Sequence, residues 1–169
     1  MTTTQNVAAT AQKITPFLWY DNQAEEAANF YVSIFKNSRI LEVTRYGDAG
    51  PGPKGTVMVV SFELDGQKYT ALNGGPRFKF DEAISFVISC ETQEEVDYFW
   101  PKLTGDGGQE SMCGWLKDKY GLSWQVTPVR LIELMKSDDA AKAQRVMQAM
   151  LQMRKIDIAI LERAAEGNS

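Results

Sequence analysis

Hydrophobic and polar residues alternate over several short stretches of the chain, and each stretch predicts a β-strand with two different faces. The clearest alternation runs over 56–64, where Asp65-Gly66 then favours a tight turn into a short strand that ends at Asn73. Strands are also predicted over 14–20 and 39–46, and apolar residues at helical spacing predict a helix over 24–35. Residues 13–75 are therefore expected to form one β-α-β-β-β module.

The same order of elements is predicted a second time, because the sequence repeats with an offset of 69 residues. The segment EEAANFY at 25–31 aligns with EEVDYFW at 94–100, and the offset also places Phe17 on Phe86. Each aligned segment begins with a possible capping box, Asn22 with Glu25 in the first case and Thr92 with Glu95 in the second. Residues 83–129 are therefore expected to form a second β-α-β-β-β module.

The ends of the chain differ from the two modules. Residues 1–12 lack the basic and apolar regions of a secretory signal and are predicted to be a disordered tail. Residues 130–169 are predicted to be a helical extension, with a first helix capped by Ser137 or Asp138 and a last one capped by Asp157. The first of these helices has an apolar stripe that favours packing on this chain or on a partner over a ligand-binding role: Ala140, Ala143, Met147, Met150 and Leu151.

A block in the second module, CGWLKDKYGLSWQV at 113–126, combines a turn signal with an alternating strand. With ITPFLWYDNQAEEAANFYVSIF at 14–35 and LNGGP at 72–76, this block resembles the PhnB-like family of the glyoxalase/vicinal-oxygen-chelate superfamily. Members of that family are often labelled 3-demethylubiquinone-9 3-methyltransferase. The resemblance runs from Lys13 to Ala164. It implies an α+β fold in which two tandem β-α-β-β-β modules form one domain with a cupped mixed sheet, here with a C-terminal helical extension.

Composition narrows the function classes. A net charge of −4 and a pI near 5.0 leave no basic face for nucleic acid. No apolar run reaches the roughly 20 residues that span a bilayer, so no membrane partner is expected. The two cysteines, Cys90 and Cys113, do not make a disulfide framework, and the protein is predicted to be cytoplasmic. The chain contains no histidine, which removes the commonest metal ligand and general base.

Metal-dependent relatives in the superfamily hold a divalent ion with four side chains on the concave face, and the resemblance places those positions here. The two first-strand positions fall on Pro16 and Ser85. One last-strand position falls on Gln125, and its counterpart falls on Thr70, or on Leu72 or Asn73 if the register slips. Proline cannot ligate through its side chain, and neutral hydroxyl and amide groups are weak ligands. We therefore predict no catalytic metal and no cofactor.

Strand alternation predicts which side chains face the concave side. Among them are the predicted ligand-pocket residues Tyr20, Val59, Ser61, Ser85, Val87 and Gln125. Trp115 is added to the predicted pocket as a ring that could stack on a ligand. Leu18 falls on the same face as Tyr20, whereas Trp19 and Trp124 are predicted to lie in the core beneath the helices.

Two residues are candidates for catalysis. Glu63 would be a base whose pKa is raised by burial, although a carboxylate at the end of a strand is more often solvated. Cys113 would be a reactive thiol at the pocket rim, although a lone cysteine beside a buried tryptophan is more often an inert small hydrophobe.

The leading hypothesis is a metal-free protein that binds a small organic molecule in the cup, either as a binding protein or as an enzyme of unknown reaction. One alternative is the methyl transfer in the family label. The first strand is followed by DNQAEEA, however, which lacks the glycine-rich loop of the common methyl-donor fold. The other alternative is a structural dimer without catalysis. A homodimer is expected under every hypothesis, because the superfamily commonly pairs modules between subunits.

Overall fold

The computed structural model describes residues 12–167, which form two compact units. The first unit ends at Lys79 and the second begins at Phe80, so the boundary falls between the two predicted modules. Residues 1–11, which make up nearly all of the predicted disordered tail, lie outside the described residues.

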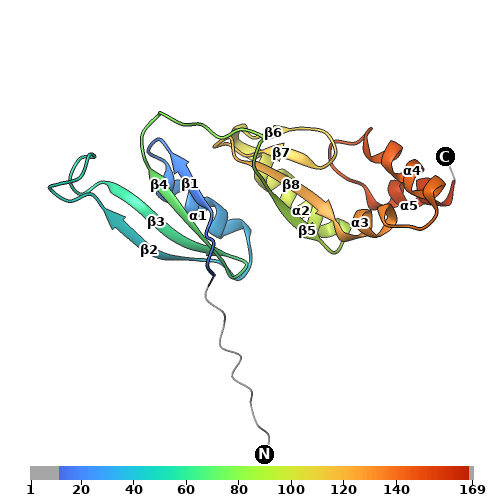
Figure 1. Ribbon diagram of the computed structural model, residues 1–169, viewed down its shortest axis with the longest axis horizontal. Coiled ribbons are helices and arrows are strands. Elements are labelled where there is room, and N and C mark those ends of the chain that lie inside the picture. The colour runs from blue at the N-terminus through green and yellow to red at the C-terminus, as the bar shows by residue number, and fades with distance from the viewer. Residues whose placement is uncertain (1–11, 168–169) are drawn as a thin grey trace, which may run out of the picture. The chain divides into compact units, whose positions relative to one another are not determined.

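The first unit is a four-stranded mixed sheet with one helix on one face (Figure 1). Along the chain its elements are β1 (Phe17–Tyr20), α1 (Ala24–Ile34), β2 (Arg39–Arg45), β3 (Val57–Leu64) and β4 (Gln67–Asn73). The strand order is β1-β4-β3-β2, with β1 parallel to β4 and the other neighbours antiparallel. This is the predicted β-α-β-β-β order.

The second unit has the same topology. Its elements are β5 (Ser85–Cys90), α2 (Gln93–Thr104), a 3₁₀ turn η1 (Gly105–Gly107), β6 (Gln109–Glu110), β7 (Trp115–Lys117) and β8 (Ser123–Pro128). The strand order is β5-β8-β7-β6, with β5 parallel to β8. The predicted α+β fold of two β-α-β-β-β modules with added C-terminal helices is confirmed.

The internal repeat is visible in the buried face of each helix. Three helix positions in the first unit and the positions 69 residues later are all buried, because each residue packs against the sheet of its own unit. The pairs are Ala27 and Val96, Tyr31 and Trp100, and Ile34 and Leu103. The offset of 69 therefore describes the helices correctly.

The offset fails in the first strands. The connection from β1 to α1 covers 21–23, whereas the connection from β5 to α2 covers only 91–92. Tyr20 consequently corresponds to Cys90 and Leu18 to Ile88, and all four are buried on the helix side of their sheets. The prediction that Leu18 and Tyr20 lie on the open face, with Trp19 in the core, is therefore wrong. A one-residue slip exchanges the two faces of a strand.

The caps of the two helices also differ. The Oγ1 atom of Thr92 accepts a 3.3 Å hydrogen bond from the Glu95 N–H, so the second predicted capping interaction is confirmed. The first is wrong, because the N-terminus of α1 has no capping side chain from its own segment. Instead, Oδ1 of Asn73, at the end of β4, accepts a 2.8 Å bond from the Ala24 N–H. A cap from a distant strand leaves no local signal in the sequence.

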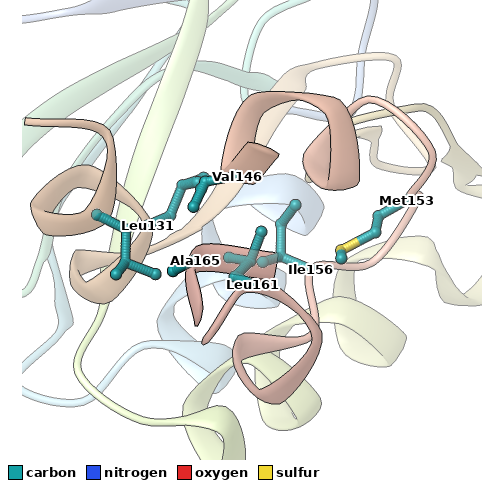
Figure 2. Packing of buried hydrophobic residues seen from close by; sticks show 7 residues of the cluster. Leu131, Val146, Met153, Ile156, Leu161 and Ala165 are labelled. Atoms are coloured by element: carbon teal, nitrogen blue, oxygen red, sulfur yellow. The ribbon is translucent and has the colours of Figure 1, made fainter. Parts of the chain in front are cut away.

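The C-terminal extension forms three helices, α3 (Val129–Met135), α4 (Ala140–Met150) and α5 (Ile158–Glu166). They share a hydrophobic cluster (Figure 2) composed of Leu131, Leu134, Val146, Met153, Ile156, Leu161 and Ala165. The cap of α4 is Asp139 rather than Ser137 or Asp138, and Asp157 caps α5 as predicted. In the part of the chain that the structure describes, every helix is too short or too polar to cross a bilayer.

The apolar stripe predicted for α4 is only partly buried. Val146, which was not in the predicted stripe, is the buried residue of this helix. Met150 packs partly against the cluster, whereas Met147 and Leu151 are exposed. Val146 is buried because the face of α4 that carries Val146, Ala149 and Met150 packs against α3 and α5.

Candidate functional site

The second sheet has α2 on one face, and its other face, called here the open face, carries several polar side chains. Across β5, β8 and β7, Val87 pairs with Gln125 and Gln125 with Trp115. Ser85 lies opposite Ser123 in the same way. Residues paired in register share a face, and Ile88, Leu116, Trp124 and Val126, which alternate with them, are buried on the α2 side. The structure thus places Ser85, Val87 and Gln125 together on one face, as the alternation predicted, and adds Trp115 to that face.

A pocket of ≈ 150 Å³ opens on this face beside β6 and β7. Its lining consists of Glu82, Gln109, Glu110, Ser111, Trp115, Leu116, Lys117 and Ser123. Trp115 is the only member that the sequence analysis selected as a pocket residue. Strand alternation was a usable signal for Lys117, which shares the face of Trp115. No local pattern indicated Glu82, because it reaches the pocket from the segment before β5.

The pocket carries charges of both signs. Nζ of Lys117 lies 2.6 Å from Oε1 of Glu82, and the lysine side chain is only 31% exposed. The hydrogen bond from Lys117 lowers the pKa of the Glu82 carboxyl below its usual value. Glu110 accepts a 2.7 Å bond from Nε1 of Trp100 and lies 3.7 Å from the guanidinium of Arg154. Arg154 is not one of the lining residues, so Lys117 supplies the positive charge of the lining.

Hydrogen bonds orient the polar side chains of β5 and β8. Nε2 of Gln125 donates a 2.8 Å bond to Oγ of Ser85, and Oγ of Ser123 donates a 3.4 Å bond to the Asp81 carbonyl. Such bonds restrict the rotamers of the side chains that make them.

The turn between β7 and β8 is built around the buried carboxylate of Asp118. Its Oδ1 accepts bonds from the N–H groups of Tyr120 (2.9 Å) and Leu122 (3.1 Å). Its Oδ2 accepts a 2.9 Å bond from Nε1 of Trp124. The sequence analysis predicted the turn but not the bond to Trp124. This network holds the two strands that carry Trp115, Lys117 and Ser123.

The first unit contains four of the predicted site residues. Val59, Ser61 and Glu63 lie on the open face of its sheet, and Oε2 of Glu63 is 3.1 Å from the guanidinium of Arg39. Tyr20 lies on the opposite face, where its hydroxyl is 3.2 Å from that of Tyr31. Tyr20 is therefore a core residue beneath α1, and its prediction as a pocket residue is wrong.

The two cysteines occupy different environments. Cys113 lies in the loop between β6 and β7 with a left-handed backbone (φ 60) and a half-buried side chain, and it does not line the pocket. Cys90 is fully buried, and burial, helped by the nearby negative charge of Glu95, raises the pKa of its thiol to about 12. A thiol with that pKa remains neutral at physiological pH and is a poor nucleophile.

The positions expected to hold a metal in superfamily relatives do not fit a divalent ion in this protein. Thr70 pairs with Phe17 as Gln125 pairs with Val87, so Thr70 is the counterpart of Gln125 and no register slip is needed. The altered offset moves the counterpart of Ser85 from Pro16 to Thr15. In each unit these positions are neutral, with Thr15 and Thr70 in the first and Ser85 and Gln125 in the second. Neutral hydroxyl and amide groups bind catalytic metals weakly. Within residues 12–167, no cluster of three or more Cys, Asp and Glu side chains is arranged to hold an ion.

Comparisons with known proteins identify the family. The family model for 3-demethylubiquinone-9 3-methyltransferase matches residues 12–127. The PhnB protein of Bacillus cereus, assigned to that methyltransferase, is 42% identical with a TM-score of 0.64, over 70% of this chain and 100% of its own. Protein PA1353 of Pseudomonas aeruginosa is 19% identical with a TM-score of 0.58, over 70% and 98%.

A third solved structure, the glyoxylase/bleomycin resistance protein/dioxygenase domain of Frankia sp., is 13% identical with a TM-score of 0.46, over 71% of this chain and 93% of its own. A comparison with curated proteins finds no match. This chain, with its two β-α-β-β-β units, belongs to the PhnB-like 3-demethylubiquinone-9 3-methyltransferase family.

Proposed function

We propose that this protein binds a small organic molecule in the pocket on the open face of the second sheet. The observation that carries the proposal is the position of Trp115 beside Lys117 in a concave site. An indole ring offers a flat apolar surface for stacking, and an ammonium group attracts an anionic oxygen. Concave sites with an aromatic wall and a few fixed polar groups are the usual binding sites for small molecules.

The size and lining of the pocket define the class of ligand. Sites for drug-sized molecules measure about 300–1,000 Å³, so ≈ 150 Å³ accommodates only a small molecule or one end of a larger one. The ligand that fits best carries a flat apolar group to stack on Trp115 and a carboxylate or similar oxygen group to engage Lys117. Such a ligand would compete with Glu82 for the ammonium group.

The test uses benzoate as a probe, because it combines a flat ring with a carboxylate. Binding is followed by two-dimensional NMR through the indole N–H signal of Trp115. Benzoate should shift that signal in a saturable way, and Lys117→Met should weaken binding about tenfold, the effect of losing one charge-assisted contact. Gln148→Ala, an exposed glutamine change on α4, is the control. No saturable shift at Trp115 with benzoate, or an equal response to benzyl alcohol, would contradict the assignment.

We propose that binding does not use a catalytic divalent ion. The neutral side chains at the expected metal positions of each unit support this part of the proposal: Thr15 and Thr70 in the first unit, and Ser85 and Gln125 in the second. Native mass spectrometry and elemental analysis of protein purified without chelators provide the test. One divalent ion per chain would contradict it.

Methyl transfer is a second candidate because the family is named for that reaction. The strand-to-helix connections 21–23 and 91–92 contain no glycine, so neither forms the glycine-rich phosphate loop of a dinucleotide-type fold. The residues present thus do not fit the usual site for S-adenosylmethionine. Isothermal titration with S-adenosylmethionine distinguishes the two candidates, because only a methyltransferase needs to bind this donor.

We also propose that the protein is a homodimer. Phe17 on the open face of the first sheet is 61% exposed, and Val87 on that of the second sheet is 57% exposed. Exposed apolar side chains on sheet faces are typical of surfaces that a partner covers. Light scattering after size exclusion should give twice the chain mass of 18.9 kDa, and Val87→Glu should shift the equilibrium toward monomer. If dimerisation were the sole function, benzoate would not bind and a bulky residue at Ser85 would be tolerated.

A further inference from the structure

The segment 153–158, which covers most of the connection between α4 and α5 and the first residue of α5, lies against the loop that joins β6 to β7. We call this segment the strap. The N–H of Cys113 donates a 2.7 Å bond to the Met153 carbonyl, and the N–H of Gly114 donates a 2.7 Å bond to the Arg154 carbonyl. Two consecutive loop amides are thus satisfied by two consecutive carbonyls of the strap. Both loop residues have positive φ angles, 60 at Cys113 and 81 at Gly114, which direct their N–H groups to the strap.

The strap is also attached to the start of α2. The amide group of Gln93 donates a 3.1 Å bond from Nε2 to the Ile156 carbonyl and accepts a 2.9 Å bond at Oε1 from the Ile158 N–H. Lys155 pairs with Asp97 one turn further along the helix. Gln93 therefore satisfies two backbone groups of the strap with one side chain.

An apolar contact fixes the strap beneath the loop. Ile156 is fully buried, and Figure 2 shows it in the same cluster as Met153 and Leu161. A Cβ atom at Gly114 would lie 3.2 Å from Cγ1 of Ile156 and 2.8 Å from the Val126 carbonyl oxygen. Glycine at 114 thus lets the loop lie directly between β8 and the strap.

The loop held in this way belongs to the wall of the pocket. The Ser111 N–H donates a 2.9 Å bond to the Trp115 carbonyl, so the lining residues Ser111 and Trp115 flank Cys113 and Gly114. Arg154 of the strap also lies 3.7 Å from Glu110, another lining residue. The strap lies beyond residue 127, where the match to the family model ends.

We infer that the strap is a positioning element that holds the β6–β7 loop and thereby sets the position of Ser111 and Trp115 in the pocket wall. The C-terminal extension, which the family model does not include, thus takes part in shaping the site. The inference rests on the proposed function only in regarding the pocket as a binding site. The contacts of the strap do not depend on the ligand.

The test is hydrogen–deuterium exchange followed by NMR on the full chain without ligand. Gln93→Ala removes the two hydrogen bonds that the Gln93 side chain makes with the strap. Gln148→Ala is the matched control. Gln93→Ala should speed exchange at the amides of Cys113, Gly114 and Ser111 on the order of tenfold, while amides of β5 and β8 keep wild-type rates. Gln93→Glu, which retains the acceptor for Ile158 but loses the donor, should give an intermediate increase.

Two results would overturn the inference. One is wild-type exchange at Ser111 and Gly114 in Gln93→Ala, which would show that the strap does not hold the loop. The other is faster exchange throughout the second unit, which would show general support of the fold instead of positioning.

A second measurement follows the Cys113 side chain and remains decisive if exchange in the variant is too fast to resolve. Iodoacetamide should label Cys113 several-fold faster in Gln93→Ala than in Gln148→Ala, with buried Cys90 as an internal reference. Equal labelling rates would count against the strap. Both measurements are made without benzoate, so failure of the proposed binding function leaves them unaffected.

Discussion

The indole nitrogen of Trp124 donates a 2.9 Å hydrogen bond to the carboxylate of Asp118, a side chain that is only 2% exposed. The same carboxylate organises the turn that precedes β8, so one buried group joins a turn to the core beneath α2. A buried carboxylate is tolerated only when its oxygens are well satisfied, as both oxygens are in this turn.

Replacing this carboxylate should destabilise the second unit. Asp118→Asn keeps Oδ1 for the two turn amides but turns an NH₂ group toward the indole N–H, so the buried donor of Trp124 loses its acceptor. The free energy of unfolding should fall by about 1–3 kcal/mol, which urea denaturation measures. In a double-mutant cycle with Trp124→Phe, the coupling should exceed about 0.5 kcal/mol. Additive effects would show that the bond contributes nothing.

Gly114 should be far less replaceable than Gly121, although both have positive φ angles. Gly114→Ala adds a Cβ 2.8 Å from the Val126 carbonyl oxygen, whereas Gly121→Ala places its Cβ in open space. Gly121→Ala should cost about 1 kcal/mol from backbone strain alone. Gly114→Ala should cost at least twice as much by thermal unfolding. Equal losses would mean that the close approach to β8 is not limiting.

Asn73 should contribute to stability through the helix that it caps from a distance. Asn73→Ala removes the acceptor for the Ala24 N–H and the 3.1 Å bond from Nδ2 to the Val57 carbonyl. The expected loss is about 1–2 kcal/mol, typical of a missing N-cap. Asn73→Asp retains the acceptor and adds a negative charge at the helix N-terminus, so it should lose less. Circular dichroism during denaturant titration ranks the two variants.

The burial of Cys90 predicts a loss of stability in alkaline solution. The pKa of its thiol rises from 9.0 to about 12 in the folded state, so the unfolded chain releases the proton first as the pH increases. The contribution of Cys90 is complete below pH 9 and should decline by about 1.4 kcal/mol per pH unit above it. Because tyrosine and lysine titrate in the same range, the measured quantity is the stability difference from Cys90→Ala. That difference should be constant below about pH 8 and shrink above pH 9, and a constant difference up to pH 11 would contradict the prediction.

Much of the fold was predictable because it depends on local periodicity. The alternation at 56–64 and the helical spacing at 25–31 and 94–100 are consequences of backbone geometry, so they determined the strands, the helices and their repetition. The shared face of Ser85, Val87 and Gln125 followed in the same way. The sequence also contains no histidine, so no imidazole ligand is available for a metal ion.

Other features were decided only by the tertiary structure. The one-residue difference between 21–23 and 91–92 reversed the faces of β1, and Tyr20 and Trp19 exchanged their predicted environments. Glu82 and Lys117, Asn73 and Ala24, and Gln93 and Ile156 are far apart in the chain and meet only after the sheets form. A periodic pattern specifies which side of its own element a residue occupies. Which residue of another element lies opposite depends on connection lengths and packing, and these determined the lining of the pocket and the position of the strap.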